Sequence, residues 1–384
     1  IDRARVNIRV NLSVPAPAGT IFRLAGRGNG LSYEAPVPQG EKEAEFSVDI
    51  PGMKLWSVED PYLYEVTASV DSQNSSDAIN TYFGMRKISA VPIPGKDFTY
   101  VALNNKPLYL KLTLDQSYHP DGFYTFPSDQ FMKEEIMRAR ELGLNGLRIH
   151  IKAEIPRKLY WADRLGLLLM ADVPNSWGDP TPAMQQEIEH ALRGMIQRDF
   201  NHPSIFAWVP FNETWGLFTR DRQDPKKRAY QPATQEWVAS IYRLAKQLDP
   251  TRLVEDNSPC NYDHVATDIN SWHFYINDYA AAKRHIAEVV EKTFPGSSFN
   301  FAAGFKQGNQ PLMNSEYGGI AARSGDQDIA WCFKYQTTEL RRHAKICGYV
   351  YTELDDIEWE HNGFVNYDRS AKAFGYDFFV EGMT

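Results

Sequence analysis

Two glutamates that lie far apart in the sequence each follow an apolar run. Glu213 comes after SIFAWVPFN, and Glu316 comes after PLMNS. A carboxylate is seldom placed at the edge of an apolar segment without a partner. Two carboxylates in one pocket suit cleavage of a glycosidic bond, because one must be protonated to supply a proton to the leaving oxygen while the other is ionised. A mechanism that retains configuration would require the two carboxyl groups to lie about 5–5.5 Å apart.

Other polar side chains occupy the same kind of position, at the end of an apolar run. They are Asp115, Arg148, His150, Asp172, Asn175, Asn212, His273, Tyr275, Glu353, Asp355 and Asp356. Taken singly, such residues are more often ion-pair partners, caps or satisfied core groups, and Trp215, Trp272 and Trp359 are more often packing residues. The catalytic interpretation therefore depends on a fold that gathers these residues at one place.

The region from residue 93 onward alternates strand and helix patterns. Eight strands are expected, at 107–114, 144–151, 167–173, 204–213, 251–256, 268–274, 311–316 and 348–354. Helices are expected at 128–143, 157–166, from 181 to about 196, 233–248 and 328–346. Such alternation predicts a parallel sheet, and eight units favour a closed (β/α)8 TIM barrel over an open doubly wound sheet, since no glycine-rich phosphate turn follows the first strand. In a barrel, the residues at the carboxyl ends of the strands share one mouth.

Residues 1–92 have a different pattern. The segments 6–14, 44–50 and 62–70 alternate apolar and polar residues, between turns rich in Pro, Gly and Ser. This is the period of half-buried strands, so a small antiparallel sandwich is expected. The segment VPIPGK at 91–96 is the expected boundary, because two prolines interrupt regular structure.

The composition excludes several other classes of protein. The 384 residues carry a formal charge of −8, which argues against a nucleic-acid footprint, and no apolar run approaches the roughly 20 residues that span a bilayer. Three cysteines, Cys260, Cys332 and Cys347, lack CxxC spacing, so neither a disulfide framework nor a zinc knuckle is expected.

Because the first residue is Ile1, we expect a trimmed or internal fragment whose cellular location cannot be read. The sequence does not indicate an oligomeric state.

Several motifs resemble those of one enzyme family. FNETWG resembles the Asn-Glu acid/base motif of retaining glycosidases with glutamates on strands four and seven, NSEYGG resembles their nucleophile strand, and WHFY their strand-six pattern. From about Lys54 to Ala373 the chain resembles glycoside hydrolase family 2, which includes the β-galactosidases, β-glucuronidases and β-mannosidases. The segments that carry this resemblance are LWSVEDPYLYEVTASV, FGMRKI, LNNKPLYLKL, YWADRLGLLLMADVP, DFNHPSIFAWVPFNE and GFVNYDRSAKAFG.

The resemblance implies an immunoglobulin-like domain at 1–92, a catalytic barrel at 93–384 and a retaining, exo-acting β-glycosidase. The sequence has no compact zinc spacing such as HExxH, and hydrolysis by two carboxylates needs no metal, so neither a metal nor a cofactor is expected. Glu213 would be the acid/base, Glu316 the nucleophile, Asn212 a partner of the sugar 2-hydroxyl, and Tyr275 the residue that orients the nucleophile. The other residues expected to contact a carbohydrate substrate are Asp115, Arg148, His150, Trp215, His273 and Tyr351. Members usually begin with a jelly-roll domain, and this sequence is expected to start after it.

The sugar is not specified by these motifs. The Asn-x-Lys carboxylate clamp of β-glucuronidases is not found, and RIHIKAEIP differs from the SHYP-type turn of β-galactosidases. Two alternatives remain open: a catalytically silent carbohydrate-binding protein on the same barrel, and an unrelated barrel enzyme such as an isomerase. The isomerase interpretation lacks a basic partner for a phosphate-binding glycine loop, since SEYGG supplies only the glycines.

Overall fold

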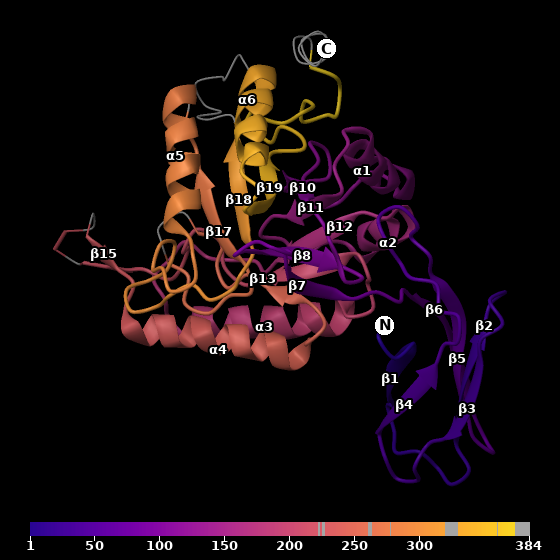
Figure 1. The fold of residues 1–384 in the computed structure, drawn as a ribbon. Coiled ribbons are helices and arrows are strands. Elements are labelled where there is room, and N and C mark those ends of the chain that lie inside the picture. Colours follow the sequence, from indigo (N-terminus) through magenta and orange to yellow (C-terminus); the bar gives the residue numbers. More distant parts are fainter. Residues whose placement is uncertain are drawn as a thin grey trace. The chain divides into compact units, whose positions relative to one another are not determined.

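The structure is a computed structural model that describes residues 1–221, 223–224, 227–259, 263–276, 278–318, 329–358 and 360–372. Cys260 and Trp359 lie outside the described residues. The chain forms two compact units, Ile1–Lys87 with Asn201–Pro203, and Ile88–Phe200 with Ser204–Thr384. Figure 1 shows both units and labels most of their elements.

The first unit consists of antiparallel strands in two sheets. One sheet pairs β1 (Arg5–Asn11) with β4 (Glu43–Asp49). The other has the order β3 (Ser32–Pro36), β2 (Ile21–Gly26), β5 (Tyr64–Asp71) and β6 (Ser76–Phe83). Phe22 of one sheet stacks on Phe46 of the other, with ring centroids 4.7 Å apart. The predicted sandwich is therefore confirmed.

A small antiparallel sheet opens the second unit. It contains β7 (Ile88–Pro92), β8 (Thr99–Leu103) and β9 (Lys106–Pro107), and the turn between β7 and β8 overlaps the segment predicted as a boundary. Tyr100 Oη donates to Ala344 O at 2.6 Å, and Thr99 Oγ1 donates to Asn309 O at 2.6 Å. Both acceptors precede barrel strands, so the hairpin packs at the amino-terminal end of the barrel. A domain boundary at residue 92 stays a prediction.

Eight parallel strands form one curled sheet in the order β16-β13-β12-β11-β10-β19-β18-β17. Their bounds are β10 Leu110–Asp115, β11 Gly146–Ile149, β12 Leu168–Asp172, β13 Ile205–Val209, β16 Leu253–Val254, β17 Asn270–Phe274, β18 Leu312–Gly318 and β19 Ile346–Thr352. All eight were predicted, and every residue of these strands is buried except Lys111 of β10, which is half-buried. Between β16 and β17, His273 N donates to Pro259 O at 2.8 Å, so hydrogen bonding continues across this junction of the predicted barrel.

Helices cover the sheet (Figure 1), and each helix contacts one helix that is its neighbour in the sequence, so that they form three pairs among the described residues. They are α1 Asp129–Glu141, α2 Pro156–Leu165, α3 Pro182–Asp199, α4 Pro232–Leu248, α5 Tyr279–Lys292 and α6 Ile329–Arg342. The predicted N-cap Ser128 accepts from Phe131 N at 3.0 Å, and Thr181 accepts from Met184 N at 3.2 Å before the proline that opens α3. Helix α5 was not predicted, although Asp278 caps it and its buried residues recur at helical spacing.

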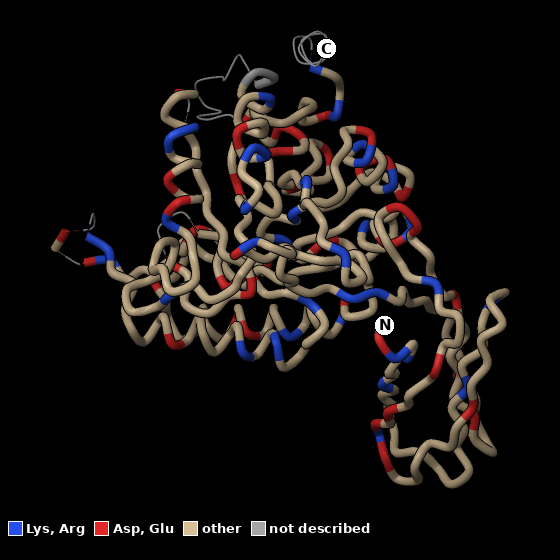
Figure 2. Tube along the Cα trace, in the orientation of Figure 1, with Lys and Arg blue, Asp and Glu red and all other residues tan. Residues whose placement is uncertain are grey.

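Two short strands, β14 (Thr219–Arg220) and β15 (Arg228–Ala229), pair in the loop after β13. Figure 2 shows acidic and basic residues interspersed along α1 and α5, in keeping with solvated outer faces. No helix in the described ranges is both long and apolar enough to cross a membrane.

Candidate active site

Glu213 lies on a tight turn beyond the end of β13. Its φ of +49° and the φ of +60° at Thr214 are left-handed, a conformation that non-glycine residues adopt only when their surroundings hold them there. Glu213 N donates to Ser258 O at 2.8 Å, and Asn212 forms a parallel bridge with Ser258. The segment after β16 therefore fixes the backbone of the Asn-Glu pair.

The two glutamates predicted as a pair lie together. One carboxylate oxygen of Glu213, one of Glu316 and one ring nitrogen of His273 are all within 4.8 Å of one another. The side chain of Glu213 is 22% exposed and that of Glu316 is 8% exposed. The pair is thus closed on the Glu316 side and more open on the Glu213 side.

A fully buried arginine links the neighbouring strand ends. Arg148 Nη1 donates to Glu316 Oε2 at 3.1 Å, and Nη2 donates to Asp172 Oδ2 at 2.8 Å and to Asn212 Oδ1 at 2.7 Å. Such a guanidinium cannot give up its proton, so it is a fixed positive charge beside Glu316. Arg148 favours the ionised form of that carboxyl and fixes the amide orientation of Asn212.

His273 stands between the two carboxylates. Its Nδ1 is 2.9 Å from Glu213 Oε1 and 3.5 Å from Glu316 Oε2, while its Nε2 is 2.7 Å from Ser258 Oγ. Burial of the ring lowers the pKa of His273 to about 4. The ring is therefore neutral near pH 7, and an Nδ1–H can donate to Glu213 without adding a charge.

Tyr275 holds the second oxygen of Glu316. Its hydroxyl donates to Glu316 Oε1 and lies 3.2 Å from Thr352 Oγ1. Burial raises the pKa of the Glu316 carboxyl, and Arg148 and the Tyr275 hydrogen bond oppose that rise. Burial also raises the pKa of Glu213, against the charge of Arg148. Glu316, with both oxygens held by donors, is the better placed of the two to stay ionised.

Asn212 carries a donor that the described residues leave unused. Its backbone N–H donates to Asn175 Oδ1 at 2.6 Å and its Oδ1 accepts from Arg148, but its buried Nδ2 has no partner there. Leaving such a donor unsatisfied costs about 1–3 kcal/mol. The arrangement is suited to a hydroxyl group supplied by a ligand.

His150 and Trp215 lie next to each other at this end of the barrel. Their ring centroids are 6.0 Å apart in an edge-to-face arrangement, and both ring nitrogens of His150 are buried without a partner in the described part of the chain. Burial lowers the pKa of His150 well below its usual value, so this ring too is neutral. A neutral imidazole can both donate and accept a hydrogen bond.

Two other residues that were predicted to contact the substrate have hydrogen-bond partners inside the protein. The buried carboxylate of Asp115 pairs with Lys158 Nζ at 2.5 Å and accepts from Ser117 N at 2.7 Å. The buried Tyr351 donates its hydroxyl to Asn362 O at 2.9 Å, and its ring packs against Tyr317. The polar groups of Asp115 and Tyr351 are thus used inside the protein.

Three small residues that support the site were not predicted. Ser258 and Ser315 join through their hydroxyls at 2.9 Å beside His273, and Thr352 touches the Tyr275 hydroxyl. Ser315 and Thr352 are near the ends of predicted strands, which is a weak signal. Nothing in the spacing distinguishes them from other hydroxyl residues.

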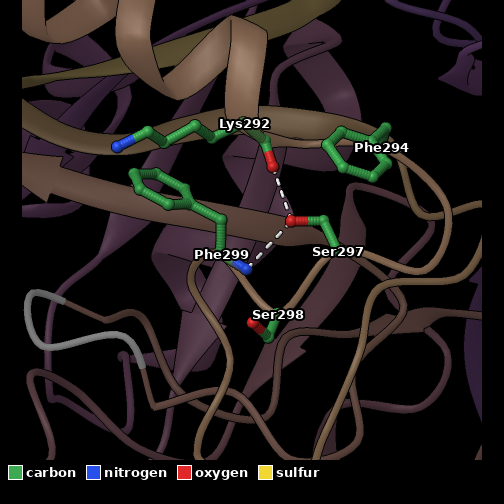
Figure 3. A pocket seen from close by; sticks show the side chains of 5 residues that line it. All are labelled: Lys292, Phe294, Ser297, Ser298 and Phe299. Carbon is green, nitrogen blue, oxygen red and sulfur yellow. Dashed lines mark hydrogen bonds between the residues drawn. The ribbon is translucent and has the colours of Figure 1, made fainter.

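A separate pocket of about 480 Å³ lies after the carboxyl end of α5. Its lining residues are Lys292, Phe294, Ser297, Ser298 and Phe299, drawn in Figure 3. Ser297 Oγ donates to Lys292 O at 2.5 Å and accepts from Phe299 N at 3.0 Å, so its polar group is satisfied within the loop. The loop leads into the start of β18, at the opposite end of the barrel from the carboxylate pair. We assign no chemistry to this pocket.

Comparisons with known proteins agree with the fold and the motifs. The family described as "Glycosyl hydrolases family 2, TIM barrel domain" matches residues 96–363, and "Glycosyl hydrolases family 2" matches residues 21–86. A β-galactosidase of Thermoanaerobacterium thermosulfurigenes is 29% identical over 59% of this chain and 28% of its own length. A β-glucuronidase of Bacteroides fragilis is 26% identical over 76% of this chain and 42% of its own.

Solved structures share the same fold. A β-galacturonidase of Eisenbergiella tayi bound to glycerol has a TM-score of 0.77 at 19% identity, over 98% of this chain and 68% of that one. A Bacteroides uniformis β-glucuronidase has a TM-score of 0.75 at 20% identity, over 98% of this chain and 47% of that one. The chain thus spans less than half the length of the two sequence relatives named above. By its matched domains, an antiparallel sandwich followed by a TIM barrel, the chain belongs to glycoside hydrolase family 2.

Proposed function

We propose that this chain carries the catalytic site of a retaining β-glycosidase that removes a terminal sugar from an oligosaccharide, polysaccharide or glycoconjugate. The observation that carries the proposal is the placement of Glu213 and Glu316 at one barrel mouth, with nearest oxygens within 4.8 Å and different hydrogen-bond partners. The names of the sequence relatives, β-galactosidase and β-glucuronidase, support a β-glycoside as the substrate.

The reaction would proceed in two displacements. Glu316 attacks the anomeric carbon and forms an ester with the sugar, while Glu213 gives its proton to the departing glycosidic oxygen. Glu213, now ionised, takes a proton from the water that attacks the ester, and Glu316 is released. One oxygen of each carboxylate lies within 4.8 Å of the other, which supports retention over inversion, because the carboxyl groups of inverting enzymes stand about 6.5–9.5 Å apart.

The neighbouring residues would each have a role in this scheme. Arg148 and Tyr275 hold the two oxygens of Glu316 and keep it ionised for attack. His273 orients Glu213 through Nδ1. The Nδ2 of Asn212, which has no partner among the described residues, would donate to the sugar 2-hydroxyl, a contact that strengthens in the transition state of glycosidases.

A panel of nitrophenyl β-glycosides tests the proposal. We expect turnover of at least one neutral or acidic hexoside, with the β-anomer as the first product seen by proton NMR. A first product of α configuration would contradict the retaining mechanism. Calorimetric binding of a monosaccharide without turnover of any substrate would favour the silent carbohydrate-binding alternative.

Substitution of Tyr275 by phenylalanine should shift the pH profile. The Tyr275 hydrogen bond lowers the pKa of Glu316 and so opposes the effect of burial. Without the hydroxyl the pKa of Glu316 rises. Because the nucleophile must be ionised, the loss of activity on acidification then begins at a higher pH than in the wild-type protein. We expect the acidic limb of the profile of kcat/KM against pH to move upward and kcat at the optimum to fall by about tenfold, the scale of one lost hydrogen bond to a charged group. An unshifted acidic limb would contradict this role.

Activity should survive chelation. Glu213, His273 and Glu316 offer ligand atoms close enough for a metal ion, but Arg148 and Tyr275 already occupy both oxygens of Glu316. A divalent ion there would have to displace a guanidinium from a buried pair. We expect kcat to be unchanged after dialysis against EDTA, and a loss that added Mg²⁺ or Zn²⁺ restores would count against two-carboxylate hydrolysis without a metal.

A further inference from the structure

Trp177 is the most exposed of the large apolar side chains in the described residues, at 71%. It lies in the loop between β12 and α3, at the same end of the barrel as Glu213. Its ring meets the ring of Trp215 edge to face, with centroids 5.1 Å apart and an interplanar angle of 88°. Trp215 follows the acid/base by two residues, so Trp177 is one aromatic contact away from the loop that carries Glu213.

The Trp177 loop is attached to the catalytic loop at more than this one point. Asn175 accepts from Asn212 N at 2.6 Å and donates to Pro210 O at 2.8 Å. Gly216 has a φ of +73°, and a Cβ at that position would come within 2.7 Å of Ser176 O. The two residues before Trp177 are therefore anchored to the catalytic loop, Asn175 through its side chain and Ser176 through its backbone, while Trp215 contacts the exposed ring itself.

A solvent-exposed indole held in this way loses little conformational freedom when a ligand covers it. Its flat apolar surface matches the apolar face of a pyranose ring. The reaction chemistry indicates which sugar ring would lie on Trp177. Because the acid/base must reach the glycosidic oxygen, the group that departs with that oxygen must lie beyond Glu213. The Glu213 side of the pair is also the more open side, because the side chain of Glu213 is 22% exposed and that of Glu316 is 8% exposed.

We infer that Trp177, supported by Trp215, forms the platform of a leaving-group subsite that binds the sugar ring to which the departing oxygen belongs. The inference rests on the proposed function and extends it, because it makes an oligosaccharide or polysaccharide the substrate rather than a glycoside with a small leaving group. His150, which contacts Trp215 and whose two ring nitrogens have no partner among the described residues, would supply hydrogen bonds at the edge of the platform.

The test compares two substrates that share the same terminal sugar, a β-linked disaccharide and the methyl β-glycoside, on the intact protein. In Trp177→Ala, kcat/KM for the disaccharide should fall by about five- to tenfold, the scale of one aromatic contact, while kcat/KM for the methyl glycoside stays within about twofold. Trp177→Phe should recover most of the loss. Phe294→Ala removes a 51%-exposed aromatic residue at the opposite end of the barrel and should change neither value.

A second readout separates a subsite from a general disturbance of the loop. A dinitrophenyl glycoside generates the glycosyl-enzyme, and an added acceptor sugar then competes with water for it. Trp177→Ala should need about five to ten times more acceptor for the same ratio of transfer to hydrolysis, with hydrolysis by water unchanged. Equal losses on both substrates, or an unchanged acceptor requirement, would overturn the platform. Wild-type protein that hydrolyses no glycoside would instead overturn the proposed function, and the subsite with it.

Discussion

Replacement of Glu316 by alanine should remove turnover of every glycoside, whatever the leaving group. In the proposed mechanism both displacements pass through the ester that Glu316 forms with the sugar, so no part of the reaction can proceed by that route without it. Removal of a catalytic nucleophile in other enzymes costs on the order of 10⁶-fold in kcat, and we expect a loss of that size. A dinitrophenyl glycoside should give no burst, because no glycosyl-enzyme can accumulate.

The controls for this variant distinguish chemistry from folding. Arg148 keeps its two bonds to Asp172 when Glu316 is absent, so the buried guanidinium is not left without a counter-ion. Glu316→Gln keeps the volume of the side chain and should be as inactive as the alanine variant. Glu288→Ala, which removes an exposed glutamate on α5, should retain wild-type activity. More than about 1% residual activity in Glu316→Gln, after exclusion of deamidation by mass spectrometry, would contradict a nucleophilic role.

The barrel could be predicted because its strands are buried on both faces. Such strands appear in the sequence as short continuous apolar runs, and the helices between them begin at residues such as Ser128 and Thr181 whose capping function is local. Strand β6 was missed for the opposite reason. Most of its residues are exposed, so SDAINTYF lacks the apolar alternation that marks a strand, and only its pairing with β5 defines it.

The site could be predicted only in part, because position at a strand end does not show what a side chain contacts. Glu213, Glu316, Arg148 and His273 are near each other because their strands end at one mouth. Asp115 ends a strand in the same way, yet its carboxylate is taken by Lys158, a residue on helix α2 that no local pattern connects with it. Such partnerships depend on tertiary packing, and a strand-end rule cannot separate a substrate ligand from one half of a buried ion pair.

Replacement of Glu213 by alanine should produce a loss that depends on the leaving group. The first displacement needs its proton only when the departing oxygen is a poor leaving group, so kcat/KM should fall by about 10²–10⁴-fold for an alkyl glycoside and change little for dinitrophenyl. The second displacement lacks its base in either case. The glycosyl-enzyme should therefore accumulate, with a burst of dinitrophenol followed by slow turnover. Arg148 and Tyr275 still hold Glu316 in this variant, so the nucleophile remains competent.

Azide supplies the decisive comparison between the two glutamates, because it attacks the anomeric carbon without a general base. In Glu213→Ala it should react with the accumulated ester, restore the rate and give the β-glycosyl azide, whose formation by two inversions retains configuration. In Glu316→Ala azide can only replace the missing carboxylate, so any product should be the α-glycosyl azide from a single inversion. The configuration of each product is read by NMR. If both variants respond alike to leaving-group acidity and give the same azide anomer, the division of roles between Glu213 and Glu316 is wrong.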